Sequence, residues 1–174
     1  MRGGLEGSEA RLIVAKRSAG LLLFRRRGGE LEVLLAHPGG PLWAKRDGGA
    51  WSVPKGEIAP GEDPLAVARR EFEEETGQRA PVGNVRSLGE VRQKSGKVVE
   101  AWAVEGDLDP STAKSNTFPL EWPPGSGDWI DLPEVDRVAW FGLDEARTRL
   151  NPAQVAFIDR LAVTVGNQPG PTAV

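Results

Sequence analysis

The segment that most constrains the fold is residues 63–77, DPLAVARREFEEETG, because it carries both the start and the stop signals of an α-helix. Asp63 suits the N-cap, since its carboxylate can accept hydrogen bonds from the free N–H groups of the first turn, and Pro64 suits the first helical position. Gly77 suits the left-handed residue that ends many helices. The sequence therefore predicts a helix over residues 64–76.

An apolar stripe and an acidic sector lie side by side on this helix. At about 100° per residue, the stripe that should pack on a sheet contains Leu65, Ala68, Phe72 and Thr76. Three carboxylates converge beside it, those of Glu71, Glu74 and Glu75, whereas Glu73 points elsewhere.

This crowding of carboxylates is unfavourable without a counter-charge. Like-charge pairs and the helix dipole in the last turn together cost on the order of 1–2 kcal/mol. A hard divalent cation such as Mg²⁺ would reverse the sign, because it binds carboxylate oxygens. A solvated acidic face, neutralised by Arg69 and Arg70, is the other interpretation that the helix geometry leaves open.

Strand patterns and Gly- and Pro-rich loops make up most of the remaining chain. Residues 18–24 and 30–37 are expected to form one antiparallel pair, and residues 82–93 and 97–106 a second. Further expected elements are a short strand at 51–54, an irregular edge segment at 117–122, a strand at 134–141, helices at 143–150 and 151–163, and loops at 107–116 and 123–133.

These elements predict an α/β (α+β) fold in one domain, in which a mixed sheet lies between helices. The chain has 174 residues, of which 39% are hydrophobic, and this is enough to bury one core. We expect the domain to span residues 11–165, with tails at 1–10 and 166–174.

Charge and composition exclude several classes of function. A net charge of −3 argues against a general nucleic-acid surface, so no stable nucleic-acid complex is expected. The absence of cysteine excludes disulfides and thiolate chemistry. No apolar run suits a signal peptide or a membrane span, so a cytoplasmic protein without a membrane partner is expected. A homodimer is compatible with the sequence.

The residues upstream of the acidic helix give the pattern a specific meaning. Gly56 is followed after five residues by Glu62, and after seven more by Arg70-Glu71-Phe72-Glu73-Glu74-Glu75-Thr76-Gly77. This spacing resembles the signature of the Nudix hydrolases at every specified position; Gln78, where the family usually has an aliphatic residue, departs from it. The resemblance covers about residues 18–163 and implies the Nudix fold. It also implies hydrolysis of a nucleoside diphosphate linked to another group, with Mg²⁺ or Mn²⁺.

The resemblance also implies roles for individual residues. Glu71, Glu74 and Glu75 are the candidate metal ligands, and either Glu71 or a metal-bound hydroxide would act as the general base. Arg70 would orient a neighbouring carboxylate. Gly56 would allow a tight turn, so that a carbonyl near Lys55–Gly56 faces the metal.

A base outside the signature is a further expectation, because some family members use a glutamate from a later loop. Glu121 is the candidate and Glu100 the alternative, although an ordinary surface glutamate fits the sequence equally well.

Substrate contacts are expected from residues near the signature. Lys45, Arg46 and Lys55 are candidate phosphate ligands, although each also fits an ordinary solvated charge. Trp51 is a candidate for stacking on a base, as are the other tryptophans of the loops, against the commoner role in packing.

The expected substrate is a small nucleotide, either a nucleoside triphosphate or a dinucleoside polyphosphate. A Nudix domain that binds a ligand as a sensor without catalysis is the alternative, but the intact glutamates of the signature favour an enzyme.

Overall fold

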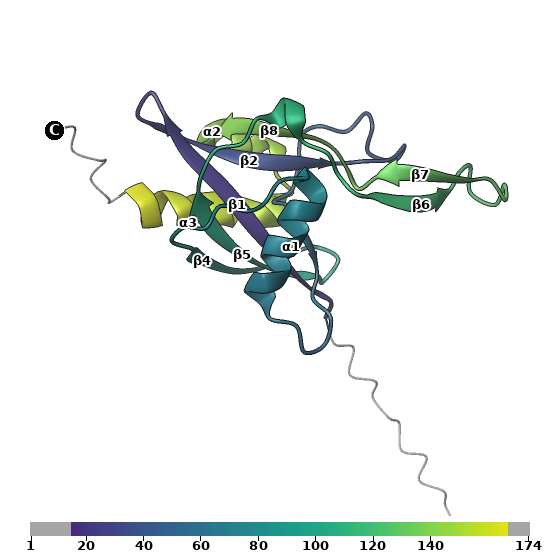
Figure 1. Cartoon of the computed structure of the whole chain (residues 1–174), viewed down its shortest axis with the longest axis horizontal. Coiled ribbons are helices and arrows are strands. Elements are labelled where there is room, and N and C mark those ends of the chain that lie inside the picture. The colour runs from purple at the N-terminus through teal and green to yellow at the C-terminus, as the bar shows by residue number, and fades with distance from the viewer. Residues whose placement is uncertain (1–14, 167–174) are drawn as a thin grey trace, which may run out of the picture.

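The computed structural model describes residues 15–166, which form a mixed sheet between helices (Figure 1). The strand order is β4-β5-β1-β2-β8, with β3 also paired to β1. β1 runs parallel to β5 and antiparallel to β2 and β3. The strands are β1 (Arg17–Arg27), β2 (Glu30–Pro38), β3 (Lys55–Glu57), β4 (Arg86–Arg92), β5 (Val98–Glu105) and β8 (Val135–Gly142). The expected fold class and both expected strand pairs are confirmed.

Helices cover both faces of this sheet. They are α1 (Pro64–Thr76), α2 (Leu143–Arg149) and α3 (Val155–Gly166), with short 3₁₀ turns η1 (Pro110–Thr112) and η2 (Pro152–Gln154). None of the helices within residues 15–166 has the length and apolar character needed to cross a membrane. The expected tail at 1–10 lies outside the described residues, as does the tail at 166–174 apart from Gly166, which ends α3.

The central strand β1 is apolar from Ala19 to Phe24, because both of its faces are covered there. Leu22 and Phe24 belong to the core on the α2 and α3 side of the sheet. Leu21 and Leu23 belong to the core on the α1 side, where they join Phe72. This alternation follows from the two-residue period of a strand, and it fixes α1 against one face of the sheet.

Helix α1 begins and ends where the sequence predicts. The Asp63 carboxylate accepts a 3.0 Å hydrogen bond from the N–H of Ala66. Gly77 has φ = 73° and donates its N–H to the Glu73 carbonyl at 2.8 Å. Ala68, Phe72 and Thr76 are buried, as the predicted stripe requires, whereas Leu65 of the same stripe is only half-buried.

A second, two-stranded sheet projects from the domain (Figure 1). It consists of β6 (Thr117–Glu121) and β7 (Trp129–Pro133), where the sequence predicted an irregular segment and a loop. β7 lacks a strand's alternating pattern because three of its five residues are exposed. The expected strand at 51–54 is also wrong, since Trp51 and Ser52 form only isolated bridges.

Candidate active site

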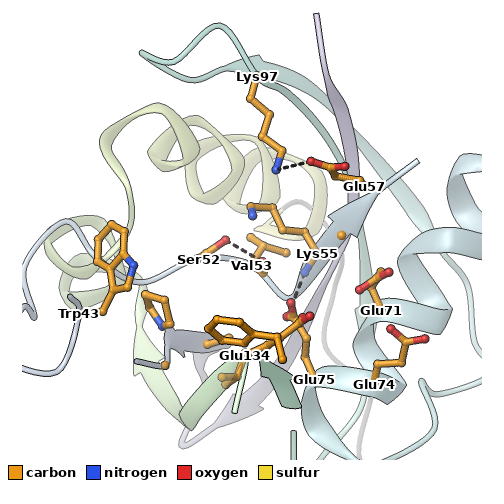
Figure 2. Close-up of a pocket in the computed structure, with 16 residues that line it drawn as sticks. Trp43, Ser52, Val53, Lys55, Glu57, Glu71, Glu74, Glu75, Lys97 and Glu134 are labelled. Atoms are coloured by element: carbon orange, nitrogen blue, oxygen red, sulfur yellow. Dashed lines mark hydrogen bonds and ion pairs between the residues drawn. The ribbon is translucent and has the colours of Figure 1, made fainter. Parts of the chain in front are cut away.

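Four residues of the signature, Gly56, Glu71, Glu74 and Glu75, line a cavity of about 500 Å³ at the C-terminal half of α1 (Figure 2). Its walls come from α1, from β3 and the residues before it, and from the end of β2 with the loop after it. Lys97, Phe118 of β6, Glu134 and the start of β8 complete them. The lining includes Pro38, Trp43, Ser52, Lys55, Gly56, Glu57, Glu71, Glu74, Glu75, Lys97, Phe118 and Glu134.

Three carboxylates in this cavity could hold one metal ion. Glu71, Glu75 and Glu134 each offer an oxygen, and these atoms lie within 4.8 Å of one another. Glu74 lines the same cavity, with a side chain 42% exposed. The structure therefore brings the three predicted glutamates of α1 to one cavity and adds Glu134, which the sequence analysis missed.

A chain of backbone hydrogen bonds places Glu134 beside α1. The N–H of Asn116 donates to the Glu74 carbonyl at 2.8 Å, and the N–H of Glu134 donates to the Asn116 carbonyl at 3.0 Å. On its other side, the Glu134 carbonyl accepts from Gly39 at 2.9 Å. The segment between β7 and β8 is thereby fixed to the end of α1 and to the loop after β2.

Burial raises the pKa of two of the α1 carboxylates. Glu75 is 8% exposed, and burial raises its pKa to about 8, although the N–H of Lys55 donates to its Oε2 at 3.1 Å. The pKa of Glu71 is also raised, first by burial and then by the neighbouring Glu74. Since burial penalises each ionised carboxylate, a bound cation would offset a cost that the helix cannot remove itself.

Two lysines provide positive charge within the same cavity. Figure 2 shows the Lys55 side chain between Lys97 and Glu75. The Lys97 Nζ lies 3.8 Å from an oxygen of Glu57, and the pKa of Lys55 is lowered, first by burial and then by Lys97. Lys97 was missed because its only local signal is a position after a turn glycine, which does not show what it faces.

Gly56 is required by the close approach of Glu71. A Cβ on Gly56 would lie 2.0 Å from the Glu71 carboxyl carbon. The expectation of a tight turn is wrong, because Gly56 lies within β3, pairs with Ala19, and does not have a positive φ. Only glycine, which has no Cβ, leaves room for the Glu71 carboxyl group at this position.

Arg70 braces the approach to α1 through Glu62. Its two terminal nitrogens donate to the two Glu62 oxygens at 2.7 and 3.3 Å. Glu62 also accepts from the N–H of Ala59 at 2.9 Å, and the hydrogen bond from Arg70 is the main cause of its lowered pKa. Arg70 lies farther from Glu71 and Glu74, at 3.8 and 4.0 Å.

The two glutamates predicted as a base outside the signature lie away from the cavity. Glu121 is in β6, and its carboxylate accepts from the N–H of Gly127 at 2.8 Å, so it stabilises the turn between β6 and β7. Glu100, the alternative, is in β5 and lies 3.6 Å from Arg17. Neither lines the cavity, and Glu134 is the later-loop glutamate that does.

Trp51 is a core residue, which corrects the expectation that it contacts substrate. It is 2% exposed, its indole N–H donates to Asp47 at 2.7 Å, and its ring packs edge-on against His37 and Phe141. Trp43, in the preceding part of the same loop, lines the cavity instead.

Lys45 and Arg46 are exposed and do not line the cavity. The Arg46 guanidinium lies 5.5 Å from the centroid of the Trp43 ring, and that ring lines the cavity.

Comparisons with known proteins agree with this geometry. The chain is 32% identical over 145 residues to the rat bis(5'-nucleosyl)-tetraphosphatase [asymmetrical], covering 76% of this chain and 83% of the relative. It is 29% identical over 144 residues to an octanoyltransferase of Myxococcus xanthus and 35% identical over 103 residues to an 8-oxo-(d)GTP phosphatase of Mycolicibacterium smegmatis. These matches cover 76% and 58% of this chain but only 36% and 26% of those longer proteins.

Solved structures share the fold. The binary complex of a C. elegans Ap4A hydrolase superposes with a TM-score of 0.60 at 20% identity, over 88% of this chain and all of the other. The family model of the NUDIX domain matches residues 14–161. Since that match spans the sheet, α1 and the cavity, the chain belongs to the NUDIX family.

Proposed function

We propose that this Nudix hydrolase cleaves the pyrophosphate linkage of a nucleoside triphosphate or a dinucleoside polyphosphate, with Mg²⁺ or Mn²⁺ as its cofactor. The observation that carries the proposal is the placement of three carboxylates and two lysines in one cavity. A phosphate chain needs both, because its own charge must be neutralised while an attacking water loses a proton.

The donor set fits a hard divalent cation. Glu71, Glu75 and Glu134 would hold it, since carboxylate oxygens are the ligands that Mg²⁺ and Mn²⁺ prefer. When bound, the cation would neutralise phosphate oxygens and the charge that develops on the leaving group. Gly56 supports this set by leaving room for the Glu71 carboxyl group.

The chain's own residues would do the remaining work. Lys55 and Lys97 would bind phosphate oxygens as point charges. Glu71 and Glu134 are the candidates for accepting the proton of the attacking water, and Glu134 replaces Glu121 as the glutamate from outside the signature. Arg70 and Glu62 would keep the segment before α1 in place.

The names of the relatives support the substrate class. The rat tetraphosphatase and the C. elegans Ap4A hydrolase favour a dinucleoside polyphosphate, and the mycobacterial 8-oxo-(d)GTP phosphatase favours a nucleoside triphosphate. With a dinucleoside polyphosphate, we expect water to enter at a phosphate distal to one nucleoside.

A substrate panel tests the proposal. The full chain would be incubated with Mg²⁺ and nucleoside triphosphates, dinucleoside polyphosphates, ADP-ribose and nucleotide sugars, and the products identified by mass in ¹⁸O-labelled water. Turnover of the polyphosphates, lost with EDTA and restored by Mg²⁺, is expected. Activity on a nucleotide sugar alone would reject the substrate class, and tight nucleotide binding without any turnover would favour the sensor alternative.

Two variants and a matched control test the carboxylates. Glu75→Gln and Glu134→Gln should each lower kcat by roughly 100-fold or more, because each removes a ligand charge. Glu73→Gln is the control, since Glu73 is exposed on the same helix and does not line the cavity. Full activity of Glu75→Gln would show that the metal site is assigned wrongly.

A further inference from the structure

The cavity has a charged end and an apolar end. Figure 2 shows Trp43 on the side opposite Glu71 and Glu74. The apolar side chains of the lining include those of Ala36, Pro38, Trp43, Phe118 and Val135, which come from β2, the loop after it, β6 and β8, whereas Glu71, Glu74 and Glu75 come from α1. A ligand with a phosphate chain at the charged end would therefore bring its other end to this apolar surface.

Trp43 and Phe118 belong to neighbouring segments at this end. Gly40, three residues before Trp43, lies so close to the Phe118 ring that a Cβ on Gly40 would be 3.9 Å from the ring's Cζ atom. Trp43 is 37% exposed, so its ring is only partly covered by the protein. Two aromatic rings thus border the apolar end, and both could contact a flat ligand.

Hydrogen bonds hold the loop of Trp43 in place. The N–H of Trp43 donates to the Gly40 carbonyl at 3.2 Å, and its carbonyl accepts from the N–H of Arg46 at 2.9 Å. The Arg46 carbonyl in turn contacts Nε2 of the buried His37 at 2.5 Å. This anchoring reduces the entropy that Trp43 would lose when a ligand binds.

The backbone at this end offers few free hydrogen-bonding groups. The backbone N–H of Ala36 donates to the Ser52 carbonyl at 2.8 Å, and the N–H of Ser52 donates to the Ala36 carbonyl at 2.9 Å. The N–H of Gly39 is bonded to the Glu134 carbonyl, and Pro38 has no N–H.

The side chains at this end are similarly occupied. The Ser52 hydroxyl donates to the Val53 carbonyl at 2.8 Å and accepts from the Gln154 amide at 3.0 Å. Among the described side chains that line this end, the indole N–H of Trp43 is the remaining polar group. One donor can meet a ring nitrogen of any purine, so it cannot distinguish adenine from guanine.

We propose that the Trp43–Phe118 end of the cavity binds the nucleotide base by stacking, and that the enzyme therefore accepts adenine and guanine substrates with similar efficiency. The inference rests on the proposed function and adds its base specificity. Stacking on an aromatic ring is available to every base. Strong discrimination needs buried polar groups that a wrong base would leave unpaired, and this end of the cavity does not present them.

The test compares bases and compares ligands with and without a base. For wild type, kcat/KM would be measured with ATP and GTP, and with Ap4A and Gp4G. Dissociation constants for ATP, GTP and inorganic tripolyphosphate would be measured by calorimetry for wild type, Trp43→Ala, Trp43→Phe and Trp129→Ala. Trp129 is a suitable control, because it is 65% exposed in β7 and does not line the cavity.

We expect kcat/KM for each adenine and guanine pair to agree within about tenfold. Trp43→Ala should weaken ATP and GTP binding alike by roughly 5- to 100-fold, without changing tripolyphosphate binding by more than about twofold. Trp43→Phe should keep most of the wild-type affinity for ATP and GTP, and Trp129→Ala should bind both nucleotides as wild type does. Circular dichroism would check that each variant is folded.

Three results would overturn the inference. A preference above about tenfold for one purine would show that the base is read by hydrogen bonds. An equal loss of nucleotide and tripolyphosphate binding in Trp43→Ala would show that Trp43 acts on the whole cavity. If wild type neither binds nor hydrolyses any nucleotide, the proposed function fails and the base site with it, whereas the first two results leave the proposed function standing.

Discussion

Replacement of Gly56 by alanine should separate the geometry of the site from the stability of the fold. The added Cβ would lie 2.0, 2.2 and 2.4 Å from the three carboxyl atoms of Glu71. Since ordinary van der Waals contact begins at 3.4 Å, the carboxyl carbon must move by about 1.4 Å. The backbone does not oppose the change, because Gly56 lies in β3 without a positive φ.

The expected loss is in activity rather than in folding. A displacement of about 1 Å in a positioned group can cost roughly 100-fold in rate, so Gly56→Ala should lower kcat/KM by about that factor and weaken Mn²⁺ binding. The free energy of unfolding should change by less than about 1 kcal/mol. The measurements are steady-state hydrolysis of a nucleotide substrate, Mn²⁺ titration by electron paramagnetic resonance, and urea unfolding.

Gly61→Ala is the matched control. Gly61 has φ = +82°, and no atom lies within 4 Å of a Cβ built there. Alanine at Gly61 should cost about 1 kcal/mol of stability through backbone strain while leaving kcat/KM unchanged. If Gly56→Ala keeps wild-type activity and Mn²⁺ affinity, the placement of Glu71 in the metal site is refuted.

Three further predictions concern the N-cap of α1, the buried histidine and the candidate general base. Asp63→Ala should lower the free energy of unfolding by about 1 kcal/mol in a urea titration and leave kcat unchanged, because it removes only the N-cap of α1. His37→Leu should cost roughly 1–3 kcal/mol by the same measurement, since leucine cannot replace the hydrogen bonds that the buried imidazole makes to the Asp136 carboxylate and the Arg46 carbonyl; a loss below 0.5 kcal/mol would contradict this. Glu121→Gln should keep kcat within about twofold, whereas Glu134→Gln should lower it by roughly 100-fold, and the reverse order would restore Glu121 as the base.

Features that depend on neighbouring residues could be predicted from the sequence. The ends of α1 follow from Asp63 and Gly77, whose hydrogen bonds reach only three or four residues along the chain. The pairs β1–β2 and β4–β5 follow from strand-like segments on either side of a short turn that contains glycine. The glutamates of α1 converge for the same reason, because the helical repeat alone sets their directions.

Predictions from local sequence patterns were wrong for an exposed strand, which has no apolar face, and for a loop residue that is buried in the core. β7 was predicted as a loop, because an exposed strand has no apolar alternation to mark it. Trp51 sits in a Gly-rich stretch typical of a surface loop, yet it is buried, since His37 and Phe141 come from other strands to cover it.

The sequence by itself determined the family, the capped helix and the carboxylates of α1, and only the tertiary structure decided what faces them. Glu134 reaches the site through hydrogen bonds of Asn116 and Gly39, which lie far away in the chain. β1 brings Lys97 and Lys55 close together, because it pairs in parallel with β5, which begins just after Lys97, and antiparallel with β3, which begins at Lys55. The reason for Gly56 is likewise a contact with a residue fifteen positions later. Such contacts are set by how strands and helices pack, and no periodicity within either segment encodes them.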